Sequence, residues 1–347
     1  MDKLLYYAIK YWIKIGLHTY YKQIGIEGLQ NIPKGRPILF LSNHQNALLD
    51  ILIIATHCSR KPWYLTRSDV FKGKMLKDFF RFLQMLPIYR IRDGKAALAK
   101  NAAIFDFCGQ LLSKNKAILL FPEANHNLKR RVRPLSKGFT RLLQSAFLVN
   151  EKLEMYLQPV GQNYKRPTQI GDSCKIIYGE PIAVSPEDVK DKTNIETLKS
   201  KVSFALKNLT VHVPEEDGYE LILHHLDTEK VDYLSPAMVN KRIQQGFLGT
   251  PKQTRSNKKI EVTKILLAVL NLPVYLLWKF VVKPKVPELE FLDTFRFMFA
   301  LLAFSFGYLI LFCALIWFYP PLTILIALIS HYFLNFVLIK VMPYSSN

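Results

Sequence analysis

Cysteine is scarce in this 347-residue chain and follows no pairing pattern. Cys58, Cys108, Cys174 and Cys313 form no C-x-x-C pair, and no histidine stands at zinc-finger spacing from them. A disulfide framework and a structural zinc site both need regular spacings of this kind, so neither is indicated. We expect four isolated, buried thiols.

Acidic residues are also few, with 27 Asp and Glu against 47 Lys and Arg and a formal net charge of +20. This charge favours a polyanion or an anionic surface as partner, either nucleic acid or phospholipid headgroups. No nucleic-acid-binding module accompanies it, which counts against nucleic acid. We expect no cleavable signal either, because Lys10 and Lys14 interrupt the N-terminal apolar stretch and no small-residue cleavage site follows. We therefore predict that the bulk of the chain is cytoplasmic.

Charged residues are absent from two long segments near the C-terminus. Residues 297–319 and 322–339 contain no Asp, Glu, Lys or Arg, and Pro320-Pro321 separates them. Each segment is long enough to cross about 30 Å of hydrocarbon. We predict a transmembrane helical hairpin, whose flanking lysines and arginines place both termini and the rest of the chain on the cytoplasmic side. Two buried core helices are the alternative, but these segments are apolar on every face.

Two further segments have a mixed character. Residues 262–282, which open the predicted membrane region 262–347, contain Lys264 and Pro273, and we favour an interfacial or re-entrant helix there over a third span. Residues 1–24 place apolar and aromatic side chains on one side of a helix and lysines on another. This amphipathic helix either lies in a membrane interface or packs on its own domain.

Residues 25–211 alternate short apolar runs with helical patterns, which predicts an α/β domain with a largely parallel sheet. The predicted strands are Pro37–Leu41, Trp63–Thr66, Pro87–Ile91, Ala117–Phe121, Tyr156–Val160 and Lys175–Tyr178. The predicted helices are Leu48–Thr56, Leu76–Met85, Lys95–Leu112, Phe139–Val149 and Glu196–Asn208. Residues 212–261 are polar, and we predict a helical appendage followed by a basic linker.

A histidine and a carboxylate stand where the first predicted strand meets the first helix. A neutral imidazole held in one tautomer by a carboxylate can remove a proton from a hydroxyl, so His44 and Asp50 are candidates for a general base and its orienting partner. The alternative is a pair of ordinary structural residues.

Basic and acidic residues follow two other strands. Arg90 and Arg92 alternate along a predicted extended segment, and guanidinium groups suit bidentate contacts with phosphate. Glu123 ends the run Phe121-Pro122-Glu123 and is placed at the same sheet edge as His44. The cluster 129–133 behind it contacts either phosphate or solvent.

In this order, the blocks resemble the phospholipid and glycerol acyltransferase family, which contains glycerol-3-phosphate and lysophosphatidic acid acyltransferases. The resemblance covers roughly residues 25–183. Its four blocks are similar to Asn43-His44…Asp50, Pro87-Ile88-Tyr89-Arg90, Phe121-Pro122-Glu123 and Pro159-Val160.

Two positions depart from the family pattern. Five residues separate His44 from Asp50, where four are usual. This NHx5D spacing is similar to the membrane-bound glycerol-3-phosphate and dihydroxyacetone-phosphate acyltransferases. Ala124 stands where the third block usually has glycine, which puts the turn beside Glu123 in doubt.

The resemblance implies transfer of a fatty acyl group from a thioester, acyl-CoA or acyl carrier protein, to a glycerophosphate or lysophospholipid hydroxyl in phospholipid biosynthesis, without a cofactor or metal. His44 would be the base, Asp50 would orient it, Arg90 with Arg92 would bind phosphate, and Glu123 would fix the glycerol part. The other residues expected to contact substrate are Asn43, Phe121, Pro122 and Lys137. An anionic phospholipid membrane is the expected surface partner.

Two rival functions remain at this point. One is the same chemistry on another lipid acceptor, such as an N-acyl amino acid. The other is a catalytically inactive, membrane-anchored lipid-binding protein.

Overall fold

The computed structural model describes residues 2–71, 73–90, 94, 96, 99–214, 217–247 and 261–342. Its centre is an eight-stranded sheet of order β1-β7-β6-β2-β5-β3-β4, with β8 paired to β6. The strands are β1 (Gln23–Glu27), β2 (Ile38–Ser42), β3 (Pro62–Arg67), β4 (Met85–Ile88), β5 (Ala117–Leu120), β6 (Met155–Tyr164), β7 (Ser173–Tyr178) and β8 (Ile182–Val184). Only β6–β7 and β6–β8 are antiparallel pairs among these strands. The predicted α/β fold with a largely parallel sheet is confirmed.

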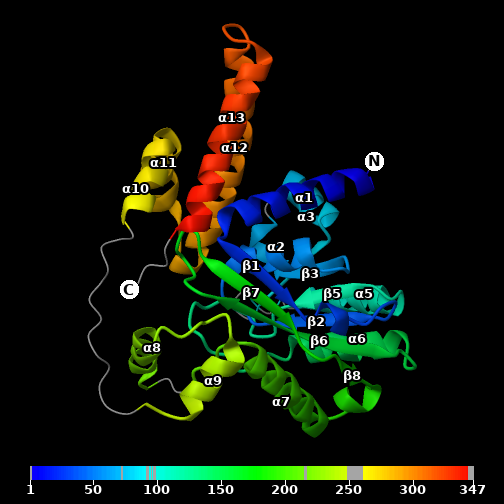
Figure 1. The fold of residues 1–347 in the computed structure, drawn as a ribbon. Coiled ribbons are helices and arrows are strands. Elements are labelled where there is room, and N and C mark those ends of the chain that lie inside the picture. Colours follow the sequence, from blue (N-terminus) through cyan, green and yellow to red (C-terminus); the bar gives the residue numbers. More distant parts are fainter. Residues whose placement is uncertain are drawn as a thin grey trace.

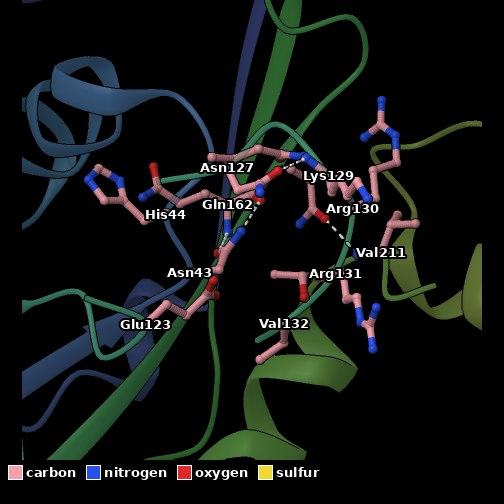
Figure 2. Close-up of a pocket in the computed structure, with 13 residues that line it drawn as sticks. Asn43, His44, Glu123, Asn127, Lys129, Arg130, Arg131, Val132, Gln162 and Val211 are labelled. Atoms are coloured by element: carbon pink, nitrogen blue, oxygen red, sulfur yellow. Dashed lines mark hydrogen bonds between the residues drawn. The ribbon is translucent and has the colours of Figure 1, made fainter. Parts of the chain in front are cut away.

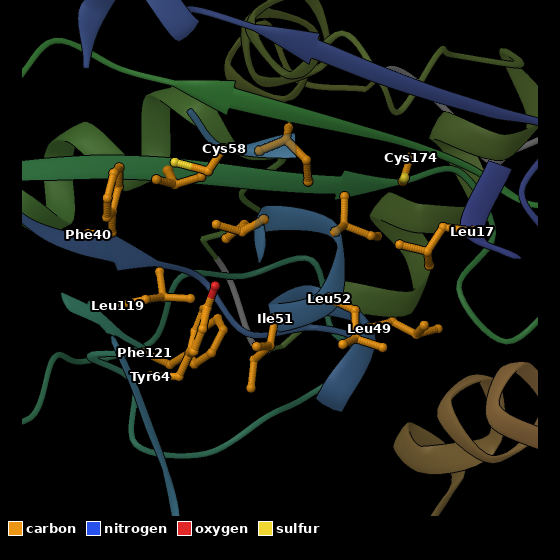
Figure 3. Close-up of a cluster of buried hydrophobic side chains, with 14 of the residues drawn as sticks. Leu17, Phe40, Leu49, Ile51, Leu52, Cys58, Tyr64, Leu119, Phe121 and Cys174 are labelled. Carbon is orange, nitrogen blue, oxygen red and sulfur yellow. The ribbon is translucent and has the colours of Figure 1, made fainter. Parts of the chain in front are cut away.

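Helices cover both faces of the sheet (Figure 1). The alternation of side chains along β2 shows why: Ile38 and Phe40 belong to one buried cluster, and Leu39 and Leu41 to another. The first cluster includes side chains from α1 (Asp2–Tyr20), α2 (Ala47–His57) and α12 (Leu292–Leu315), and part of it is drawn in Figure 3. The second includes side chains from α5 (Asn101–Ser113), α6 (Gly138–Val149) and α7 (Lys192–Leu209). A strand buried on both faces explains the continuous apolar sequence of residues 38–41.

The C-terminal hairpin consists of α12 and α13 (Pro321–Val341), which project away from the sheet (Figure 1). Residues Leu289–Leu315 and Pro321–Val341 are long and apolar enough to cross a membrane. The preceding helices α10 (Glu261–Leu270) and α11 (Leu272–Leu277) meet at a bend of 100°. Such a break is that of a divided span or a re-entrant loop. A cavity of about 770 Å³ lies among α1, α10, α11, α12 and α13.

Helix α1 packs on the first cluster through Leu17 and Tyr20, while Leu4, Tyr11 and Ile15 are exposed. It therefore contacts its own domain and keeps an outward apolar side. Its position at a membrane interface stays a prediction.

The polar segment after α7 forms α8 (Tyr219–Thr228) and α9 (Pro236–Gln244). Leu226, Tyr233 and Val239 form a small core with Val211. The Arg130 guanidinium lies 3.7 Å from the centre of the Tyr233 ring and so joins this appendage to the loop after β5.

The sequence-based boundaries differ from the structure in several places. Strands β1 and β8 and helix α9 were not predicted; β1 crosses the expected boundary at residue 24, and β8 has only three residues. Strand β4 spans Met85–Ile88 rather than the predicted Pro87–Ile91, because the residues that pair with β3 are Met85 to Ile88. Helix α3 (Lys74–Phe82) lies slightly earlier than predicted, and α5 begins at Asn101 rather than at residue 95, which is outside the described residues. Cys58, Cys108 and Cys174 are buried as expected, but Cys313 is exposed.

Candidate active site

The candidate catalytic residues follow the carboxyl ends of neighbouring parallel strands. Along the sheet the order is β2, β5, β3 and β4. His44 follows β2 and Glu123 follows β5, Arg67 ends β3, and Arg90 follows β4. Carboxyl ends of parallel strands form one edge, where loops are open to a ligand. The fold thus places an imidazole, a carboxylate and two guanidinium groups along a single edge.

His44 and Asp50 form a direct hydrogen bond, with Nδ1 of the imidazole 2.7 Å from Oδ2 of the carboxylate. Asp50 lies in the first turn of α2 and is fully buried, whereas the His44 side chain is 14% exposed. Because the carboxylate is an acceptor here, the neutral imidazole carries its proton on Nδ1. No hydrogen bond to Nε2 is formed by the described residues, so that nitrogen can accept a proton.

Asp50 is held by four hydrogen bonds. Its Oδ2 accepts from His44 and from the backbone N–H groups of Gln45 and Asn46, both at 2.8 Å. Its Oδ1 accepts from the Tyr164 hydroxyl at 2.6 Å. Burial and the Asp50 carboxylate raise the pKa of Tyr164 well above its ordinary value, so that hydroxyl remains a donor. The carboxylate therefore has one fixed orientation.

The turn between His44 and Asp50 includes a strained residue. Ala47, the first residue of α2, has φ of +42°, a left-handed conformation that alanine rarely adopts. This turn is how the chain fits five residues between the imidazole and the carboxylate while keeping their contact. Backbone strain of this kind persists where surrounding contacts determine the conformation.

Aromatic rings fix the plane of the His44 imidazole. The Phe121 ring stacks on it with centroids 3.9 Å apart and an interplanar angle of 13°. His126 makes an edge contact at 5.6 Å. Burial lowers the pKa of His126, and the nearby His44 lowers it further, which favours a neutral His126. Phe121, predicted to contact substrate, therefore packs on the imidazole of His44.

The loop that carries His44 is anchored on both sides. Asn43 exchanges two hydrogen bonds with the Gln162 backbone in β6, at 2.7 and 3.0 Å (Figure 2). The His44 carbonyl accepts from the Asn127 N–H at 3.1 Å, and the Gln45 side chain donates to the Leu128 carbonyl at 3.0 Å. Asn43, predicted to contact substrate, has its amide committed to β6. It holds the loop.

Glu123 is buried and paired with Arg133, whose Nε lies 2.8 Å from Oε2. Burial raises the pKa of Glu123 to about 7, although the Arg133 guanidinium opposes that shift. Its other oxygen, Oε1, is buried without a hydrogen-bond partner within the described part of the chain. An acceptor of this kind can receive a hydrogen bond from a substrate hydroxyl.

The raised pKa of Glu123 makes the stability of the fold depend on pH. Its folded pKa of about 7 exceeds the ordinary 4.5, so the folded chain holds a proton that the unfolded chain releases between those values. Stability from this group is present below pH 4.5 and is lost as the pH rises to about 7. We expect the melting temperature of Glu123→Gln, relative to the unaltered chain, to rise between pH 5 and pH 8. A flat or falling difference would contradict the assignment.

Ala124 occupies the turn after Glu123 with φ of +62°. The left-handed region costs an L-residue about 1–2 kcal/mol, whereas glycine in the unfolded chain loses about 0.4–1 kcal/mol more entropy on folding. Ala124 is exposed, so little packing changes with the substitution. We expect Ala124→Gly to stabilise the fold by up to about 1 kcal/mol and Ala124→Val to destabilise it, as thermal unfolding midpoints would show. A lower midpoint for the glycine variant would refute the strain.

Arg90 and Arg67 meet at a shared carboxylate. Nε of Arg67 lies 3.2 Å from Oδ1 of Asp69, and Nη2 of Arg90 lies 3.4 Å from Oδ2. Because β4 ends at Ile88, Arg90 stands beyond the strand rather than in the extended segment predicted for it. Arg92 lies outside the described residues.

The basic cluster 129–133 is divided among different partners. Arg130 donates to the carbonyls of Tyr164 and Lys165 at 2.7 and 2.9 Å, so its guanidinium holds the fold together. Contact of the cluster with phosphate stays a prediction. Residues 129–132 of the cluster border a small polar pocket, and His44 lies across it from Arg130 and Arg131 in Figure 2. The small polar pocket is lined by Asn43, His44, Gln45, Glu123, Asn127, Lys129, Arg130, Arg131, Val132, Gln162, Asn163, Thr210 and Val211.

Two further predicted contacts lie differently from expectation. Lys137 is an exposed residue at the N-terminus of α6 and does not line this pocket. The Pro122 carbonyl accepts a hydrogen bond from the Ser136 N–H at 2.7 Å, which closes the loop between β5 and α6. Pro122 therefore shapes the loop that presents Glu123.

Sequence reasoning missed three groups at this site. Arg67 follows the predicted strand 63–66 by one residue, so the strand-end reasoning used for Glu123 could have found it. His126 and Tyr164 gave no such signal, because only the fold brings them to His44 and Asp50.

The fold is an α/β domain, and its site holds a histidine–aspartate pair at the carboxyl edge of the sheet. Residues 23–162 match the model of the Acyltransferase family, so the chain contains an acyltransferase domain. It is an acyltransferase.

A similar solved structure is the crystal structure of the 1-acyl-sn-glycerophosphate (LPA) acyltransferase, PlsC, from Thermotoga maritima. The two chains are 17% identical, with a TM-score of 0.43, over 58% of this chain and 78% of that one. No curated protein matches the sequence significantly.

Proposed function

We propose that this acyltransferase moves a fatty acyl group from acyl-CoA or acyl carrier protein to glycerol-3-phosphate or 1-acylglycerol-3-phosphate. The observation that carries the proposal is the 2.7 Å contact between His44 and Asp50 at the carboxyl edge of an acyltransferase domain. The open Nε2 faces no protein donor among the described residues, so an acceptor hydroxyl can use it.

The reaction is a direct transfer. Nε2 of His44 takes the proton of the acceptor hydroxyl while that oxygen attacks the thioester carbonyl. Asp50 stabilises the imidazolium that forms, because it already accepts the Nδ1 proton. Collapse of the tetrahedral intermediate breaks the C–S bond, and the leaving thiolate takes the proton from the imidazolium. The products are an ester and a thiol, and the step needs no covalent acyl-enzyme, metal or cofactor.

The acceptor phosphate would bind to Arg90 and Arg67. Both lie at the catalytic edge, and guanidinium groups form charge-assisted bonds with phosphate oxygens. Asp69 keeps the two arginines together before substrate arrives. Glu123 would accept from a glycerol hydroxyl through Oε1. Arg92 remains a proposed helper.

A membrane is the expected place of work, since acyl chains partition into lipid. The net charge of +20 suits an anionic phospholipid surface, and the hairpin is long enough to span a bilayer. We propose that the acyltransferase domain and both termini lie in the cytoplasm, because lysines and arginines flank the spans.

An acceptor panel tests the proposal. The purified full chain would receive labelled acyl-CoA or acyl carrier protein with glycerol-3-phosphate, 1-acylglycerol-3-phosphate or an N-acyl amino acid. We expect acylation of a phosphate-containing acceptor and a raised KM for that acceptor in Arg90→Ala. Preference for the phosphate-free acceptor would overturn the assigned substrate class, and no transfer to any acceptor would favour a lipid-binding protein.

A further inference from the structure

The first turn of the C-terminal hairpin contacts the catalytic loop, by which we mean residues 43–50, from Asn43 to Asp50. We define the hairpin base as residues 288–296, which lead into and begin α12. Within it, Asp293 is fully buried. Oδ2 of Asp293 accepts a hydrogen bond from Nδ2 of Asn46 at 3.1 Å. Asn46 stands two residues after His44 and is also fully buried, so this contact reaches across 247 positions of the sequence into the catalytic turn.

The amide of Asn46 can serve Asp293 in only one orientation. Its Nδ2 faces the carboxylate and lies 3.4 Å from the Tyr21 hydroxyl, while Oδ1 has no partner in the described part of the chain. Turning the amide over would place Oδ1 against the carboxylate, two acceptors without a proton between them. The side chain of Asn46 is therefore oriented by the hairpin.

Asp293 is itself held rigidly. Its Oδ1 accepts from the Tyr20 hydroxyl at 2.7 Å and pairs with Arg296. Arg296 also donates to the Tyr20 hydroxyl at 2.7 Å and to the Thr168 carbonyl at 2.8 Å. A buried carboxylate with a charged partner and two neutral donors has little freedom to move. The network joins α1, α12 and the loop before β7.

The same network extends to the helices of the predicted membrane region. Tyr20 and Arg296 line the cavity of about 770 Å³ among the helices α1 and α10 to α13. The hairpin base also contacts His126, whose ring packs against His44. The ring centroids of Phe291 and His126 are 4.6 Å apart, and Nε2 of His126 lies 3.4 Å from Oε2 of Glu288. The hairpin base thus reaches the site by two routes, directly through Asn46 and through His126, which contacts His44.

We propose that Asp293 is a positioning residue for acyl transfer, which makes the hairpin part of the active site as well as an anchor. The role rests on the proposed function. The backbone N–H of Asn46 donates to Asp50, and the Asn46 side chain donates to Asp293. One residue therefore connects the orienting carboxylate to the hairpin. When the side-chain contact is lost, the turn can shift and carry His44 and Asp50 out of line with the bound hydroxyl.

A double-mutant cycle on the full chain tests this role. The variants are Asn46→Ala, which keeps the backbone N–H to Asp50, Asp293→Ala, which removes the acceptor of the Asn46 side chain, and both together. A misplacement of about 1 Å costs roughly 10²-fold in rate, so we expect each single variant to lower kcat by about 10–100-fold with little change in either KM. The double variant should be no worse than the poorer single variant, because both changes break the same contact.

A matched control comes from Glu290, in the same hairpin base. It has no hydrogen bond or ion pair in the described part of the chain, so Glu290→Gln removes one negative charge without touching the network. We expect a near-normal kcat for Glu290→Gln. Any small change in kcat should multiply with that of Asn46→Ala when the two variants are combined. If Asp293→Ala does not fold, Asn46→Ala alone still decides, since it leaves Asp293, Tyr20 and Arg296 in contact.

The outcomes separate the two proposals. If the unaltered chain is active and Asn46→Ala has an unchanged kcat, the positioning role alone is overturned. That role is also overturned if the kcat losses of the two single variants multiply in the double variant. An unaltered chain without acyl transfer overturns the proposed function and, with it, the role of Asp293.

Discussion

Replacing His44 by alanine is expected to lower kcat/KM for acyl transfer by about 10²–10⁴-fold, the usual contribution of a general base. The imidazole is the group whose Nε2 is open at the sheet edge, and its Nδ1 is already committed to Asp50. Initial rates with saturating thioester and varied acceptor would measure the loss. Binding of the chain to anionic vesicles should be unchanged, because the hairpin and net charge remain.

The matched control for this variant is His224→Ala. His224 is exposed on α8, where its hydrogen bonds among the described residues are to Thr228 of the same helix. Its loss should leave both activity and vesicle binding as they were. Unchanged turnover in His44→Ala would exclude the imidazole as the base, whatever the control shows.

Asp50→Asn, as a separate single variant, is expected to lower kcat by about 10²–10⁴-fold, a loss comparable to that of His44→Ala. The amide oxygen can replace Oδ2 and accept from His44, Gln45 and Asn46, while the amide N–H₂ can donate to the Tyr164 hydroxyl if that hydroxyl rotates. The fold is therefore largely kept. What disappears is the negative charge that stabilises the imidazolium, so the loss should be in kcat.

Tyr164→Phe provides the contrasting variant. It removes the hydrogen bond to Oδ1 and keeps the carboxylate charge, leaving a buried acceptor without a partner. Such a group costs about 1–3 kcal/mol of stability. We expect a lower thermal midpoint with less than a tenfold loss of kcat. Equal kcat losses in Tyr164→Phe and Asp50→Asn would contradict a role for the charge itself.

Local pattern predicted much of this molecule. The apolar run 37–41 predicted β2, and the two uncharged segments predicted α12 and α13. The placement of His44 after a strand and Asp50 in a helix could also be predicted, because those residues are close in sequence and strand ends share one edge. What stays untested there is the chemical role of each side chain.

Long-range contacts could not be predicted in the same way. Tyr164 reaches Asp50 from 114 positions away, and Asp293 reaches Asn46 from 247. Neither pairing follows from periodicity or spacing, because the topology alone brings these side chains together. The basic cluster shows the same limit: its sequence suggested a phosphate site, but not that Arg130 stacks on Tyr233 and donates to two backbone carbonyls.

The most direct measurement is a structure of the full chain in lipid with glycerol-3-phosphate and a non-reactive acyl thioester analogue. A base must lie within about 2.6–3.2 Å of the oxygen whose proton it takes. We predict that the acceptor hydroxyl lies at that distance from Nε2 of His44, with the phosphate against Arg67 and Arg90. An acceptor bound with its hydroxyl beyond reach of His44, or with its phosphate away from both arginines, would contradict this mechanism.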